Sequence, residues 1–349
     1  MTARSGRSES TPRLLPLPEG RKLYEAHIAR PRVTGGVRKS TCKRYRTTFD
    51  KFLKFCISIG VTTWNGVTAE VLTAYAGHLE TAGYAYKSQV NELTTLKQAI
   101  KWLVSAKHLT GTAPIALKLR KAQSEPAYCY RPEEIAAMIE HCRATAGLNW
   151  VGDVVVGLAC TGLRIAEFAS LRWSDVNLDA QRLTITDETG QPIKAGRQRR
   201  ELKGGQSRSF PINADFLAVL RRLPHADQYV FHGPRGGRLK PDTVRRVFIR
   251  EVIEPLADRF PAVDGDKGFA DGRLHSFRHA FCSTCANRGV PIRVVMTWLG
   301  HKDSSMINTY YHLHDSESRR QMDELDFLGG AGGRAVGEAA QIPVDNARC

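Results

Sequence analysis

Residues 274–314 read LHSFRHAFCSTCANRGVPIRVVMTWLGHKDSSMINTYYHLH, and the rest of the chain can be interpreted from them. His275 and Arg278 lie three residues apart, so a helix would present both side chains on one face. Both can donate hydrogen bonds to an anion, and the arginine keeps its charge at neutral pH. The pattern indicates a site that binds an anion.

The second half of the stretch adds a histidine and a tyrosine. An L-G-H motif ends at His301, and Tyr310 follows nine residues later. Ser304 or Ser305 could begin a helix that carries the tyrosine. We therefore expect a phenol close to the anion-binding donors.

The composition favours a partner that carries negative charge. The chain has 349 residues, 42% of them hydrophobic, which predicts two domains with a packed core in each. Its formal net charge is +16 and its pI about 9.7, so nucleic acid is the first expected partner and an acidic membrane surface the second. No apolar run approaches the roughly 20 residues that cross a bilayer. We expect a cytoplasmic protein with no place in a membrane.

Charge and periodicity divide the chain into segments. The N-terminal segment is rich in Arg, Pro, Gly and Ser, with a short possible helix near Lys22–Ala29. A linker is expected where prolines and basic residues replace the periodic apolar pattern. The expected segments are a flexible basic arm at 1–37, a helical domain at 38–110, the linker at 111–130, a second domain at 131–328 and a disordered tail at 329–349.

The first domain is predicted to be a small helical bundle. Ser40 could cap a first helix that ends at Gly60, and further helices fit Thr68–Thr81 and Ser88–His108. Basic residues crowd the first helix, which suits contact with a DNA backbone; an ordinary solvated surface is the alternative. These basic residues are Arg38, Lys39, Lys43, Arg44, Arg46, Lys51 and Lys54.

The second domain is predicted to combine helices with a small sheet. Residues 151–178 predict a helix, a tight turn at Gly162 and a second helix that begins at Arg164. Around Gly204 and Gly205, the flanking segments are expected to pair as a β-hairpin. The other expected elements are a strand at Arg182–Thr186, the hairpin strands Arg197–Lys203 and Ser207–Ile212, and helices at Asn213–Leu223 and Asp242–Pro255; residues 187–196 receive no assignment.

These motifs together resemble the tyrosine recombinase (phage integrase) family. The H-x-x-R pair, the L-G-H motif, the tyrosine nine residues after it and a histidine two residues later match the family's C-terminal motifs. The run Thr161–Glu167 resembles the first-arginine box, and Lys203 with Pro211 resembles the hairpin that presents the family's lysine. The resemblance implies that Arg164, Lys203, His275, Arg278, His301 and Tyr310 are catalytic, with Glu167 as a supporting acid.

Two positions leave alternatives within this assignment. Lys194 is the alternative lysine if the hairpin has another register. Tyr311 adjoins the expected nucleophile Tyr310.

The resemblance also implies a fold and an activity. The fold would be mainly α with a small antiparallel sheet, in which an N-terminal helical, SAM-like DNA-binding domain precedes an α+β catalytic domain. The activity would be site-specific cleavage and rejoining of double-stranded DNA through a covalent 3′-phosphotyrosine, leading to recombination or integration. No ATP, metal or other cofactor is expected, and the active assembly would be a homo-tetramer in a synaptic complex.

The residue types suit this chemistry. Two arginines can grip the charge that builds on the non-bridging oxygens of a phosphodiester. A tyrosine with a pKa of about 10 needs a base or a positive field, and His275 with the arginines can supply either. His301 can donate to a phosphate oxygen, while Lys203 can protonate the leaving 5′-oxygen. The covalent phosphotyrosine would conserve the bond energy for rejoining.

Three other classes of protein stay open. His275 and His279 are spaced i,i+4 as on a zinc-binding helix, but the glutamate between them is missing and Arg278 adds positive charge. A type IB topoisomerase would share the chemistry, and a non-catalytic DNA-binding protein would keep the residues as a relic. Cys282 and Cys285 form a C-x-x-C without a second pair, so we expect the cysteines to be reduced and buried.

Overall fold

The computed structural model describes residues 14–110, 115–120, 127–192, 199–262 and 267–300. The chain divides into two compact units, Met1–Glu125 and Pro126–Cys349, and each is described by itself. The predicted residues Lys194, His301 and Tyr310 lie outside the described residues, as do Tyr311 and the predicted C-terminal tail.

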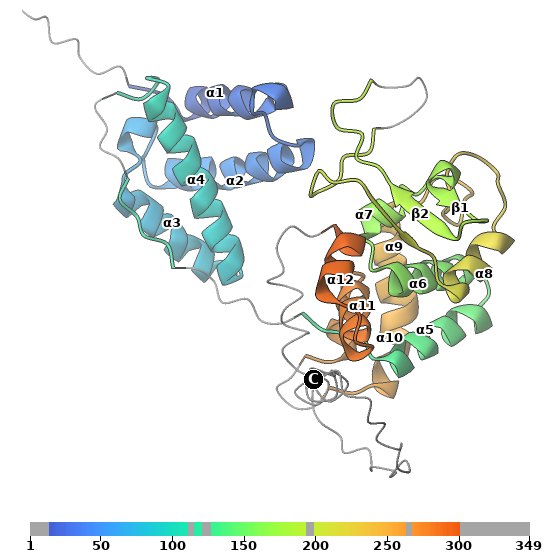
Figure 1. Cartoon of the computed structure of the whole chain (residues 1–349). Coiled ribbons are helices and arrows are strands. Elements are labelled where there is room, and N and C mark those ends of the chain that lie inside the picture. Colours follow the sequence, from blue (N-terminus) through green and yellow to red (C-terminus); the bar gives the residue numbers. More distant parts are fainter. Residues whose placement is uncertain (1–13, 111–114, 121–126, 193–198, 263–266, 301–349) are drawn as a thin grey trace, which may run out of the picture. The chain divides into compact units, whose positions relative to one another are not determined.

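The N-terminal unit is a helical bundle. Aromatic side chains fill its core, and Phe49, Phe52, Trp64 and Tyr75 are fully buried. Thr68 caps its helix through a hydrogen bond from the Val71 N–H, as the residue type predicts. The helices are α1 (Leu17–Ala29), α2 (Lys39–Ser58), α3 (Ala69–Thr81) and α4 (Tyr86–Ser105), and the last three confirm the predicted helices (Figure 1).

Helix α1 corrects the prediction of a flexible arm at 1–37. Leu17, Tyr24 and Ile28 are buried in the core of the bundle. Gly20 packs so closely on Trp64 that an added Cβ would lie 2.3 Å from its indole nitrogen. The sequence indicated only a short possible helix near Lys22–Ala29, because the apolar stripe of α1 is sparse; Pro18 lies in its first turn, where proline is tolerated. Residues 14–29 therefore belong to the domain.

The second unit is built around helix α6, which packs against α5, α8 and α11. Its buried residues include Val151, Val155 and Leu158. A run from Pro241 to Leu256 is helical with a π-helical segment at Ile249–Ile253, which confirms the helix predicted there. The helices are α5 (Pro132–Ala144), α6 (Asn149–Thr161), α7 (Ile165–Phe168), α8 (Ala214–Arg222), α9 (Pro241–Phe248), α10 (Glu254–Leu256), α11 (Ser276–Asn287) and α12 (Ile292–Leu299).

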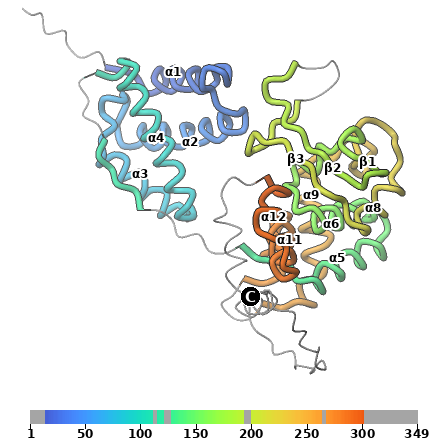
Figure 2. Tube along the Cα trace, in the orientation of Figure 1, coloured from blue at the N-terminus to red at the C-terminus, as the bar shows by residue number. Residues whose placement is uncertain are grey.

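The sheet is antiparallel, with the order β1 (Val176–Asn177), β2 (Arg182–Ile185) and β3 (Arg208–Pro211). Leu183 pairs with Phe210 in the register of β2 and β3, and both side chains are buried. The described parts of the long connection between these strands extend beyond the sheet (Figure 2). The prediction of a mainly α fold with a small antiparallel sheet is confirmed.

The predicted hairpin around Gly204 and Gly205 is wrong in its strand pairing. Strand β3 pairs with β2, while residues 199–203 form no strand. The segment RQRRE at 197–201 has no alternating apolar residues to bury, whereas β2 supplies Leu183 and Ile185. Lys203 therefore lies in the connection between β2 and β3, at a turn.

The predicted linker is partly taken up by both units. The division between the units falls inside 111–130. Leu117 and Leu119 pack against the N-terminal core, whereas Tyr130 is buried in the second core with its ring centroid 4.8 Å from that of Phe277. In the described part of the chain, no helix is long and apolar enough to cross a membrane.

Candidate active site

A turn at Gly162 positions Arg164 in the site. Helix α6 ends at Thr161, and Gly162 follows with a φ of +59°. A Cβ on Gly162 would lie 2.8 Å from side-chain atoms of both Leu299 and Phe281, so this position needs glycine for its conformation and for its space. The chain then turns directly into α7, at whose start Arg164 lies partly exposed.

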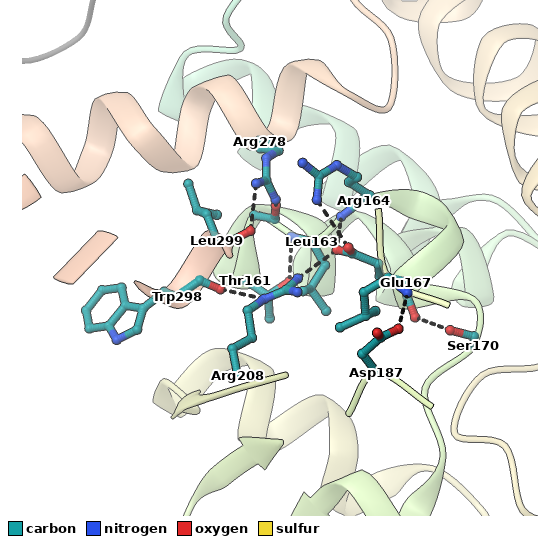
Figure 3. A network of polar contacts seen from close by, with 12 residues as sticks. Thr161, Leu163, Arg164, Glu167, Ser170, Asp187, Arg208, Arg278, Trp298 and Leu299 are labelled. Carbon is teal, nitrogen blue, oxygen red and sulfur yellow. Dashed lines mark hydrogen bonds and ion pairs between the residues drawn. The ribbon is translucent and has the colours of Figure 1, made fainter. Parts of the chain in front are cut away.

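Glu167 holds Arg164 and a second arginine (Figure 3). Its carboxylate accepts from the Arg164 guanidinium and main-chain N–H, each at 3.2 Å, and from Nη2 of Arg208 at 2.7 Å. Burial opposes ionisation, but the charges of Arg208 and Arg164 outweigh it and lower the pKa of Glu167. Glu167 is therefore a buried carboxylate anion between two cations.

Arg278 joins the first-arginine turn to the end of α12. It is fully buried, and its Nη1 and Nη2 donate to the main-chain carbonyls of Gly162 at 2.7 Å and Leu299 at 2.9 Å (Figure 3). Burial, followed by the charge of Arg164, lowers the pKa of Arg278 to about 9. The guanidinium therefore remains charged at neutral pH.

Two buried arginines hold the last turn of α12. Arg208 donates from Nε to the carbonyl of Trp298 at 2.9 Å, beside the Leu299 carbonyl that Arg278 binds. Helix C-termini leave such carbonyls without helical partners and carry partial negative charge, so both contacts are favourable. Gly300, with a φ of +64°, ends the helix directly before the predicted His301.

His275 lies at the N-terminal end of α11, with its ring centroid 5.2 Å from that of His279. The residue is accessible to solvent, yet its ring is partly desolvated and lies among cationic groups. Loss of solvation, followed by the charges of His279, Arg278, Arg164 and Lys203, lowers the pKa of His275 to about 4. The imidazole is therefore neutral at neutral pH, which favours a base over a source of positive charge.

Lys203 is exposed on a turn that lies against the end of α12. The Gly205 N–H donates to the Leu202 carbonyl at 3.1 Å and closes the turn. A Cβ on Gly204 would lie 3.2 Å from the carbonyl oxygen of Gly300. The structure thus brings Lys203, Arg164 and Arg278 close enough to His275 to depress its pKa.

Several supporting residues were missed by the sequence reasoning. Arg208 fell within the predicted strand Ser207–Ile212 and was given no role of its own, and the acids at 187 and 188 fell in a segment without an assignment. The segment 187–208 contains both acids and arginines that could form ion pairs, but the partners lie up to 41 residues apart along the chain. The missed residues are Arg172, Asp175, Asp187, Glu188, Arg200 and Arg208.

The residues needed for a metal centre do not gather in the described ranges. Among those residues, no group of three or more His, Cys, Asp or Glu side chains is placed to hold a metal ion. His275 and His279 lie on either side of the buried cation Arg278 in the chain, which opposes a cation at that position.

Two models of known protein families match this chain. The model of the phage integrase family matches residues 130–317, more than half of the chain. The chain belongs to the phage integrase family. The model of the phage integrase N-terminal SAM-like domain matches residues 24–107, a range that begins inside α1. The predicted family, that of the tyrosine recombinases, is confirmed.

Individual relatives agree with this membership of the phage integrase family. The chain is 23% identical over 297 residues to tyrosine recombinase XerC of Herpetosiphon aurantiacus, which covers 84% of this chain and 91% of that protein. Its fold is similar to the Tn1549 transposon integrase in complex with transposon right end DNA, with a TM-score of 0.67 at 18% identity over 87% of this chain and 98% of the other. A lambda integrase tetramer bound to a Holliday junction gives a TM-score of 0.65 at 17% identity, covering 85% and 77%.

Proposed function

We propose that the chain is a site-specific recombinase that cleaves and rejoins double-stranded DNA through a covalent 3′-phosphotyrosine at Tyr310, without ATP or metal. The observation that carries the proposal is the gathering of Arg164, Lys203 and Arg278 around a neutral His275. A site with this excess of cations suits one phosphodiester group and its developing negative charge.

The arginines bind the scissile phosphate. Arg164 is partly exposed beside Glu167, so its guanidinium is accessible to the non-bridging oxygens. Arg278 is fully buried and supplies a fixed positive charge, because the two main-chain carbonyls hold its guanidinium. Such preorganised charge stabilises a transition state without reorganisation.

His275 removes the proton of the tyrosine. A phenol with an ordinary pKa of about 10 is protonated at neutral pH, and a neutral imidazole can accept its proton during attack. The bound phosphate would raise the pKa of His275 towards that of an ordinary histidine, which improves the match between base and task. His301 would donate to a phosphate oxygen, and Lys203 would protonate the departing 5′-oxygen.

The partners follow from charge and from the relatives. The basic residues of α2 suit the DNA backbone, and the solved relatives named above are bound to DNA. We propose a homo-tetramer in the synaptic complex, by analogy with the lambda integrase tetramer, and action on DNA in the cytoplasm.

The nucleophile is tested by trapping the covalent intermediate on a nicked DNA site. Tyr310→Phe should abolish the protein–DNA adduct while leaving DNA binding nearly unchanged, and Tyr311→Phe should keep the adduct. The wild-type adduct should form at a 3′-phosphate and survive EDTA. A 3′ adduct formed by Tyr310→Phe, or cleavage that EDTA removes and zinc restores, would overturn the proposal.

A further inference from the structure

The turn that carries Lys203 is held by a buried leucine and by the half-buried carboxylate of Asp187. The side chain of Leu202 is buried in the core of the second unit, and its main-chain N–H donates to Oδ1 of Asp187 at 2.8 Å. The residue before Lys203 is therefore fixed by packing and by a hydrogen bond. The residue after it, Gly204, lies against the Gly300 carbonyl.

Asp187 contacts both sides of this turn. Its own N–H donates to Oγ of Ser207 at 2.9 Å, on the far side of the turn from Leu202. The hydroxyl of Thr189 donates to the same Oδ1 at 3.0 Å and orients the carboxylate. Asp187 thus spans residues 202–207 and sets where the turn begins and ends. Figure 3 draws it in the polar network of the site.

Glu188, the residue after Asp187, links the connection between β2 and β3 to the segment that follows Arg164. Glu188 exchanges hydrogen bonds with Arg200, whose main-chain N–H donates to Oε2 at 2.7 Å, and it forms an ion pair with Arg172 at 2.6 Å. The guanidinium of Arg200 in turn donates to the Ser170 carbonyl and to Asp175. Because both arginines are buried, the connection has a rigid base beneath Asp187.

We propose that Asp187 is a positioning residue for Lys203, acting through the hydrogen bond that its carboxylate accepts from Leu202. This inference rests on the proposed function, in which Lys203 protonates the leaving 5′-oxygen. A lysine side chain is long and flexible, so its ammonium can meet one oxygen reliably only if the main chain at its base is fixed. The contacts that hold Arg164 and Arg278 involve other residues, so a substitution of Asp187 should leave both arginines in place.

The test uses DNA in which sulfur replaces the bridging 5′-oxygen. A thiolate leaves without a proton, so a defect in proton donation disappears on this substrate. Asp187→Ala should cleave ordinary DNA roughly 10- to 100-fold more slowly than wild type and the sulfur-bridged DNA at close to the wild-type rate. Lys203→Ala should show the same rescue, and Arg164→Ala should show none. Asp187→Asn keeps an acceptor oxygen and should cleave both substrates nearly normally.

Two further variants keep the test decisive. Asp179→Ala removes an exposed acid from the loop between β1 and β2 and should leave both rates unchanged. Should Asp187→Ala fail to fold, Ser207→Ala removes the contact of the Asp187 main-chain N–H on the far side of the turn and should give a smaller loss with the same rescue. The positioning role is overturned if Asp187→Ala, or a folded Ser207→Ala, is slowed equally on both substrates or on neither. It is also overturned if Asp187→Asn is as slow as Asp187→Ala. A Lys203→Ala variant that stays slow on the sulfur substrate instead overturns the proposed role of the lysine.

Discussion

Replacing Arg208 by methionine tests whether a buried ion pair maintains the site. Arg208 links Glu167, which holds Arg164, to the Trp298 carbonyl at the end of α12. Methionine keeps most of the volume and removes the charge and the donors. We expect the variant to fold less stably and to cleave DNA more slowly, because α12 loses one of the contacts that fix its last turn.

The magnitude follows from the contacts. Breaking a buried ion pair by removing one partner costs about 3–5 kcal/mol. Glu167 would retain Arg164 at 3.2 Å, so the loss should lie near the lower end, about 3 kcal/mol. The hydrogen bond to Trp298 contributes about 1 kcal/mol more. We therefore expect the free energy of unfolding at pH 7 to fall by about 4 kcal/mol.

The pH dependence gives a second measure of the same pair. The pKa of Glu167 is lowered in the folded protein, so its contribution is fully present above the unfolded value of about 4.3. The contribution is lost as the pH falls through the lower pKa of the folded state. The difference in unfolding free energy between wild type and Arg208→Met should therefore shrink below about pH 4.

Urea unfolding of the DNA-free protein measures both effects. A double-mutant cycle with Glu167→Gln should give a coupling energy of at least about 1.5 kcal/mol at pH 7. The control is Arg182→Met, which removes an exposed arginine of the same sheet whose contact with Ser209 is 3.4 Å long; it should change stability by less than about 0.5 kcal/mol. A coupling below about 0.5 kcal/mol would refute the structural role of the pair.

Three further predictions concern the turn, the base and DNA binding. Gly162→Ala should lose about 2–4 kcal/mol in urea unfolding, because it adds a close contact to backbone strain, whereas Gly147→Ala, with a φ of +80° in open space, should lose only about 1–2 kcal/mol. On the acid side, the pH profile of kcat/KM for cleavage should fall as the pH drops towards about 4, where free His275 becomes protonated; a fall near pH 6.5 would contradict a neutral base. A clamp on about ten phosphates should give a slope of log K against log salt near roughly −9, and a slope near zero would exclude it.

Regular apolar periodicity made most of the helices predictable. In α2 the residues Tyr45, Phe49, Phe52 and Cys56 recur at helical spacing, and all four side chains are buried. Helix α1 was predicted only as a short possible helix near Lys22–Ala29, because few of its apolar residues reach the core and the segment around it is rich in Arg, Pro, Gly and Ser. Its burial depends on Trp64 and other residues of the later helices, a contact that local pattern cannot reveal.

The residues of the site also divide into those that the sequence predicted and those that it did not, and the reason is chemical. Groups proposed to meet the phosphate must be Arg, Lys, His or Tyr, so their types and spacing can be recognised in a sequence. The groups that hold them face no such restriction: two main-chain carbonyls accept from Arg278, and a main-chain N–H donates to Asp187, and nearly every residue possesses both of these main-chain groups. Contacts to the main chain do not restrict which residue type stands at a position. Gly162 is an exception, because its positive φ and its crowded surroundings require glycine. For this reason most of the missed supports lie in the segment 187–208, with partners such as Arg172 and Asp175 earlier in the chain, and the fold, not a motif, brings these partners together.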